Sequence, residues 1–217
     1  MLVRLFYIHI MRGSIKKVTA GVYEGIDAIE NEHLKVLFKA IIEVNKDFYS
    51  TPEPQNDSDE AIAQLERVFA YELYHQWSLI LEVFNAEKQK DDRRIINGEI
   101  GKQLLGVKKY PDMVLHKGHG DIRHQEIVVE IKRKNAIKDD NVAQDIIKLS
   151  NFMTEGFLGC SASPYSEGVF ILTNGNEDDI KKQLKMIDKK EHLNPNIYCI
   201  FCNGEEKLEY ITVGEIS

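Results

Sequence analysis

The spacing of apolar residues changes near residue 92, and this change constrains the fold more than any other feature of the sequence. Before it, over 24–49 and from about residue 57 to Asn85, apolar residues recur at three- and four-residue steps, which is the pattern of amphipathic helices. After it the period becomes two, the period of a β-strand. The chain is therefore expected to form a mixed β-sheet flanked by helices, an α/β fold.

Further elements are expected along the chain. Strands are predicted at 95–100, 111–116, 126–132, 168–173, 197–202 and 208–213, and helices at 141–153 and 177–191. The proline-containing stretch 50–58 is typical of a turn or linker, and Asp57 or Ser58 is expected to cap the helix that follows it. The sequence thus predicts an N-terminal helical appendage over 1–56 and an α/β core over 57–217.

Charge and cysteine content narrow the class of protein. No apolar run approaches the length of a membrane helix, so no membrane partner is expected. The net charge of −7 argues against a protein that coats nucleic acid over its whole surface, yet residues 88–138 hold thirteen basic against seven acidic side chains. Three cysteines are too few to staple a secreted scaffold, so a cytoplasmic location is expected.

The expected strand 126–132 carries charged residues where a central strand is usually apolar. Alternation places Glu130 and Lys132 on the same face, and Asp112 stands at the entrance of the preceding strand, after Pro111. If the two strands pair, the carboxylates of Asp112 and Glu130 lie close together. The alternative is a solvated strand face with a cross-strand ion pair.

Two neighbouring carboxylates repel each other unless a divalent cation joins them. Mg²⁺ binds through one or two carboxylates and keeps exchangeable waters, so a Mg²⁺ site is predicted at Asp112 and Glu130, with Mn²⁺ as a substitute. Those waters can be exchanged for the oxygens of a phosphate group. Lys132 would then orient a water that attacks the phosphate and would offset the charge that develops on phosphorus.

The helix that ends near Asn85 supplies a further candidate. Glu72 and Gln76 interrupt its apolar stripe, and a buried carboxylate needs a partner. One interpretation has Glu72 reaching the metal site with support from Gln76. The other has the pair at the edge of the stripe, where the two side chains bond only to each other.

These residues, in this order, resemble the PD-(D/E)xK nuclease superfamily, which includes restriction endonucleases and Holliday-junction resolvases. The resemblance covers roughly residues 58–173. It implies a restriction endonuclease-like fold and Mg²⁺-dependent cleavage of phosphodiester bonds that leaves a 5′-phosphate. It also implies that Asp112 and Glu130 bind the metal, that Lys132 is the catalytic lysine, and that Glu72 is the helical acid. Glu99 is a further candidate metal ligand; the alternative is an exposed strand residue beside a glycine.

Basic and polar residues near these positions are candidates for holding the nucleic acid, with DNA the expected substrate. Arg133 and Lys134 follow the catalytic lysine and could grip the phosphate backbone. Some branches of the superfamily carry a helical glutamine followed four residues later by tyrosine. Here Gln144 is followed by Lys148, and the two share a helix face that could hold a phosphate.

Two other functions stay open at this point. The chain could be a catalytically silent nuclease-like module that binds nucleic acid or a protein, or an ordinary α/β interaction domain whose motif is a coincidence. The appendage 1–56 is expected either to pair two copies as a homodimer or to cover the substrate groove.

Overall fold

The computed structural model describes residues 16–19, 26–49, 59–98, 111–117, 124–138, 140–155, 164–187, 192–203 and 207–216. Glu99, the expected helix cap at 57–58 and the linker 50–58 lie outside these residues, so the predictions made for them remain predictions. No helix in the described ranges is both long enough and apolar enough to cross a membrane.

The described elements are α-helices, β-strands and short 3₁₀ turns. The α-helices are α1 (Glu32–Glu43), α2 (Asp59–Ala86), α3 (Asn141–Thr154), α4 (Glu177–Leu184) and α5 (Val213–Ile216). The strands are β1 (Lys16–Thr19), β2 (Arg94–Gly98), β3 (Met113–Lys117), β4 (Gln125–Arg133), β5 (Glu167–Thr173), β6 (Ile197–Cys202) and β7 (Lys207–Thr212). Short 3₁₀ turns lie at η1 (Ile26–Ala28), η2 (Lys46–Phe48), η3 (Lys90–Asp92) and η4 (Lys134–Ala136).

The strands form one mixed sheet in the order β1-β7-β6-β5-β4-β3-β2. β4, β5 and β6 run parallel to one another in the centre, and the outer pairs are antiparallel. The predicted mixed sheet flanked by helices is confirmed. The central strands are mostly apolar on both faces, as is typical where helices cover both sides of a sheet, and Glu130 and Lys132 of β4 depart from this pattern.

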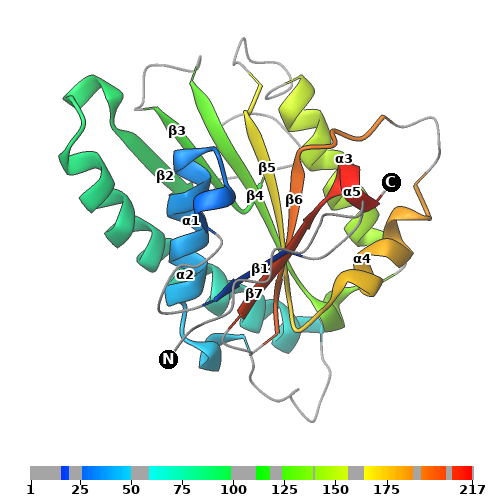
Figure 1. The fold of residues 1–217 in the computed structure, drawn as a ribbon. Coiled ribbons are helices and arrows are strands. Elements are labelled where there is room, and N and C mark those ends of the chain that lie inside the picture. The colour runs from blue at the N-terminus through cyan, green and yellow to red at the C-terminus, as the bar shows by residue number, and fades with distance from the viewer. Residues whose placement is uncertain are drawn as a thin grey trace, which may run out of the picture.

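The two faces of the sheet pack against different helices (Figure 1). α1 and α2 cover one face, and their buried side chains join Val129 and Ile131 of β4 in a single apolar cluster. α3 and α4 cover the other face, where Val128 of β4 packs among their apolar residues. Even-numbered residues of β4 therefore face α3, and Glu130 and Lys132 are among them.

The N-terminal segment was expected to be a helical appendage, but its described part belongs to the core. β1 pairs antiparallel with β7 at the edge of the sheet. In α1, Leu34, Leu37 and Phe38 are fully buried in the cluster that also contains sheet residues. α1 also packs along α2, so it forms a structural layer of the fold, not a separate unit.

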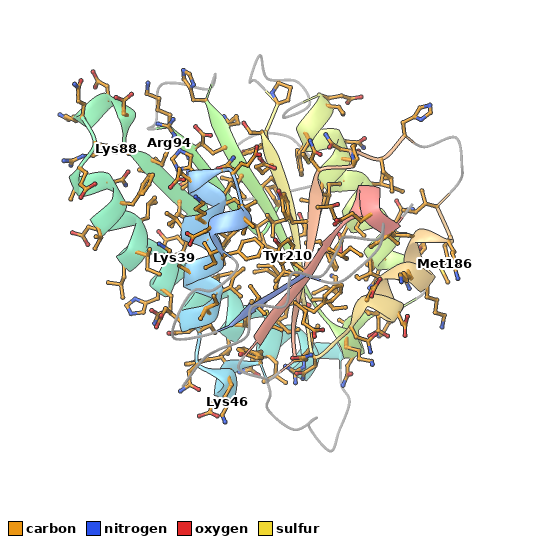
Figure 2. The ribbon with its side chains drawn as sticks, viewed as in Figure 1. Lys39, Lys46, Lys88, Arg94, Met186 and Tyr210 are labelled. Carbon is orange, nitrogen blue, oxygen red and sulfur yellow. The ribbon has the colours of Figure 1, made fainter. Side chains whose placement is uncertain are left out.

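Local signals place α1 more narrowly than the expected helix over 24–49. Asn31 caps its start by accepting hydrogen bonds from the backbone N–H groups of His33 and Leu34. Val44 ends it in an extended conformation. Figure 2 shows Lys46, in the 3₁₀ turn that follows, at one end of the molecule, with Lys88 and Arg94 at the opposite end.

Candidate active site

Asp112 and Glu130 are brought together by the pairing of β3 with β4. Met113 lies opposite Val129 in this antiparallel pair, so one further step along the register places Asp112 opposite Glu130. Side chains directly opposite each other on neighbouring strands lie on the same face. Asp112 is held firmly, because its N–H donates to the Val129 carbonyl at 3.1 Å and its Oδ2 accepts from the Ile131 N–H at 2.7 Å.

The carboxylate of Glu130 is in an unfavourable environment for a negative charge. The residue is only 4% exposed. Burial and the nearby charge of Asp112 raise the pKa of Glu130 well above its usual value, and burial also raises the pKa of Asp112. Glu130 Oε2 accepts from Lys148 Nζ at 2.8 Å, whereas the buried Oε1 has no hydrogen-bond partner. An unsatisfied buried carboxylate oxygen costs free energy, and a bound cation would remove that cost.

Helix α3 adds Asp145 and Lys148 to the two acids and Lys132. Lys132 Nζ lies 3.4 Å from Asp145 Oδ2, and Lys148 Nζ lies 3.3 Å from Asp145 Oδ1. Asp145 therefore holds two lysines, a role that the sequence analysis missed. Its signal was its position three residues before Lys148, which places both side chains on one face of the helix.

The two lysines stay protonated at neutral pH. Burial acts to lower the pKa of Lys132, but Glu66 and Asp145 raise it above its usual value. In the same way Glu130 and Asp145 outweigh the effect of burial on the pKa of Lys148. Lys132 can therefore act as a hydrogen-bond donor and a positive charge, and not as a general base.

The acid that α2 contributes to this region is Glu66, not the predicted Glu72. Glu66 Oε2 accepts from the Arg133 N–H at 3.1 Å, at the end of β4, and the charge of Lys132 opposes the rise that burial causes in the pKa of Glu66. Glu72 lies six residues further, about 120° around the helix axis and about 9 Å along it. There it accepts from Gln76 Nε2 at 2.7 Å, which is the alternative considered for this pair.

These six side chains are called the carboxylate–lysine cluster from here on. Its members are Glu66, Asp112, Glu130, Lys132, Asp145 and Lys148.

The residues predicted to hold nucleic acid are placed very differently. Arg133 is 1% exposed, and its Nη1 donates to the Tyr49 carbonyl at 3.3 Å, so in this structure its side chain cannot reach a substrate. Lys134 is 45% exposed and pairs with Asp179 at 3.3 Å. Gln144 is exposed and bonds to Asp140 at 3.1 Å, and Lys148 alone of the predicted helical pair enters the cluster.

The donor set fits Mg²⁺ in one specific way. Within the described residues, no group of three or more histidine, cysteine, aspartate or glutamate side chains is arranged to hold a metal ion. Mg²⁺ does not require three, because it binds through one or two carboxylates and keeps several waters. Asp112 and Glu130, with the unpartnered Oε1, are the two carboxylates that would hold it.

Comparisons with protein-family models, curated proteins and solved structures found no match for this chain.

Proposed function

We propose that this protein is a Mg²⁺-dependent nuclease that hydrolyses phosphodiester bonds in DNA or RNA and leaves a 5′-phosphate. The observation that carries the proposal is the pairing of β3 with β4. It gathers Asp112, Glu130 and Lys132 on one face, with a buried carboxylate oxygen that has no partner. Two neighbouring carboxylates repel each other and lower the stability of the folded protein, so their presence together favours a functional role.

Each of these side chains has a separate role in the proposed reaction. Asp112 and Glu130 hold the Mg²⁺, which when bound polarises a phosphate oxygen and the attacking water. Lys132, protonated and next to the acids, orients that water and offsets the charge that develops on phosphorus. Glu66 positions Lys132 by its charge and fixes the end of β4 through the Arg133 N–H.

The order of elements supports a restriction endonuclease-like fold. α2, the antiparallel strands β2, β3 and β4, then α3 and β5 follow one another as the resemblance to the PD-(D/E)xK superfamily implies. The acidic and lysine side chains come from the elements that the resemblance assigns to them. The helical acid is shifted by six residues along α2, from Glu72 to Glu66.

Cleavage assays on duplex DNA, single-stranded DNA and RNA test the proposal, each with Mg²⁺, with Mn²⁺ and with a chelator. We expect metal-dependent cleavage of at least one substrate and 5′-phosphate ends. Lys132→Met should lower the rate by about 10²-fold or more, because it removes a preorganised positive charge from the transition state. Circular dichroism should show that the variant is folded.

Two glutamates on one helix provide a matched pair for the same assay. Glu66→Gln should lower the cleavage rate, because it removes a charge that acts on Lys132. Glu72→Gln makes the same chemical change six residues away on a different side of α2, where Glu72 is bonded to Gln76, and should leave the rate near that of the wild type. If Glu72→Gln is the more damaging change, the assignment of the helical acid to Glu66 is wrong.

A catalytically silent nuclease-like module is the second candidate. The observation in its favour is that lysines already neutralise two acids of the cluster, Glu130 and Asp145. It predicts salt-sensitive retention of nucleic acid without cleavage, and no rise in melting temperature with Mg²⁺ or Mn²⁺.

A further inference from the structure

Lys148 forms an ion pair with Glu130, the same carboxylate that is proposed to bind the divalent cation. Its ammonium lies 2.8 Å from Glu130 Oε2 and 3.3 Å from Asp145 Oδ1, and its side chain is 15% exposed. One oxygen of Glu130, Oε2, is therefore bonded to Lys148, and the other, Oε1, has no hydrogen-bond partner. The negative charge of Glu130 is therefore already neutralised by the ammonium group of Lys148.

An ammonium and a divalent cation cannot share one buried carboxylate without strong repulsion. Charges of the same sign a few ångströms apart repel steeply where water is largely excluded, and Glu130 is almost fully buried. A cation held between Asp112 and Glu130 would therefore push the Lys148 ammonium away from Glu130. The free energy needed to move Lys148 away from Glu130 therefore lowers the affinity of the site for the cation.

The structure contains a second acceptor for the displaced lysine. Asp145 is already within 3.3 Å of Lys148 Nζ, and both residues belong to α3, three positions apart. A lysine side chain is flexible and carries three rotatable donors, so it can leave one carboxylate and keep the other.

We propose that Lys148 is a displaceable internal counter-ion: it neutralises Glu130 in the metal-free protein and moves fully onto Asp145 when a divalent cation binds. This inference rests on the proposed function, because it assigns the cation to Asp112 and Glu130. It explains how acids that repel each other are tolerated before the cation arrives. It also makes Lys148 a residue that sets the metal affinity of the site.

Isothermal titration of Mn²⁺ into the metal-free protein tests the inference without any nucleic acid. Lys148→Met removes the competing charge, so we expect it to bind Mn²⁺ about tenfold more tightly than the wild type, or tighter still. Asp145→Asn removes the negative charge that would hold the displaced lysine and should weaken Mn²⁺ binding. Lys148→Met should also lower the metal-free melting temperature, because Glu130 loses its partner.

Lys35→Met is the matched control. It makes the same change of side chain and charge, and it breaks a lysine–glutamate pair of 2.7 Å with Glu32 on α1, outside the cluster. Its Mn²⁺ affinity should stay within about twofold of the wild type, because a distant surface charge is screened.

Equal affinities for Lys148→Met and Lys35→Met would overturn this inference and leave the proposed function standing. Failure of every one of these proteins to bind Mn²⁺ would overturn both. If Lys148→Met does not fold, Lys148→Arg replaces it. Arginine grips a carboxylate with two parallel bonds and should weaken Mn²⁺ binding, so an unchanged or higher affinity would again refute the inference. A crystal structure with Mn²⁺ should show Lys148 Nζ bonded to Asp145 and no longer to Glu130.

Discussion

Replacing Asp112 with asparagine is expected to stabilise the metal-free protein and to reduce strongly its stabilisation by a divalent metal. The physical reason is that Asp112 is partly buried among an excess of negative charge, and this burial raises the pKa of its carboxyl group. The raised pKa means that the unfolded chain releases this proton at a lower pH than the folded protein does. At neutral pH the ionised carboxylate therefore costs folding free energy. An asparagine amide can still accept the hydrogen bond from the Ile131 N–H.

The size of the stabilisation by Asp112→Asn can be estimated from the charges in the carboxylate–lysine cluster. When all groups are ionised, Asp112 faces three carboxylates and two ammonium groups, which leaves one uncompensated repulsion. One such repulsion across about 7 Å is worth about 2 kcal/mol at an effective dielectric constant of about 20. The hydrogen bond from Ile131 weakens by about 1 kcal/mol when its acceptor becomes neutral. Since burial adds to the repulsion, the net gain is about 1–2 kcal/mol, or about 2–8 °C in Tm for a chain of this length.

Differential scanning calorimetry with and without Mn²⁺ measures both effects. The wild type should gain about 2.7 kcal/mol at a Mn²⁺ concentration about 100 times Kd, and Asp112→Asn should gain much less. Near pH 3.8, the usual pKa of an aspartate, the difference in metal-free Tm should shrink, because Asp112 becomes protonated in the unfolded chain as well. A lower metal-free Tm for the variant at neutral pH would refute the electrostatic reasoning. An undiminished Mn²⁺ shift would refute the assignment of Asp112 as a ligand.

Three further predictions concern neighbouring residues and the opposite end of the sheet. Arg133→Met should lower stability by about 1–3 kcal/mol, because the Tyr49 carbonyl loses a donor, and should leave nucleic-acid affinity unchanged in a filter-binding assay. Lys134, the next residue, is exposed. Lys134→Met should instead weaken nucleic-acid binding and make the slope of log binding constant against log salt concentration shallower by about one, the value of a single phosphate contact, with little change in Tm. Burial lowers the pKa of His33 below its usual 6.5, so its contribution to stability is present above that pH and is lost as the pH falls through the lower value. His33→Phe, which keeps the edge-to-face contact with Phe84, should therefore give a shallower fall in Tm between pH 7 and pH 5, and a parallel fall in both proteins would contradict this account.

Features set by neighbouring residues were predictable from the sequence. The long second helix was expected to run from about residue 57 to Asn85, and α2 is observed from Asp59 to Ala86. Pairing of the Asp112 strand with the Glu130 strand was the condition on which the carboxylate site depended, and the structure shows that the two strands are antiparallel neighbours. Alternation along β4 then placed Glu130 and Lys132 on one face, which the structure confirms by the contacts of both with residues of α3.

The orientation of each helix was harder to predict. On α2 the buried stripe is Phe69, Leu73, Trp77 and Leu81. It is rotated from the stripe that was expected to include Glu72, and this rotation is what moves Glu66 to the site. On α3 the cluster contains Asp145 in place of the neighbouring Gln144. One residue is about 100° on a helix, so a small error in the apolar stripe selects a different polar side chain.

The role of α1 could not be read from local patterns. Its apolar residues gave a helix, but its sequence does not say whether that helix packs on the sheet or extends from it. The answer depends on β1 pairing with β7 and on α1 lying against α2 over the sheet, and both are contacts between distant parts of the chain. Hydrophobic periodicity reports on one segment at a time and carries no such information.

The carboxylate–lysine cluster is built from elements far apart in the chain, from Glu66 on α2 to Lys148 on α3, and this has a consequence for protein synthesis. A growing chain releases α2 before β3 and β4, and only afterwards α3 with Asp145 and Lys148. Until α3 has emerged and docked, the acids of β3 and β4 lack their lysine partner on that helix, and the site is incomplete. If the protein is the nuclease proposed above, chains that end before residue 148 should show no cleavage activity, because they lack the second half of α3 and the central strands β5 and β6.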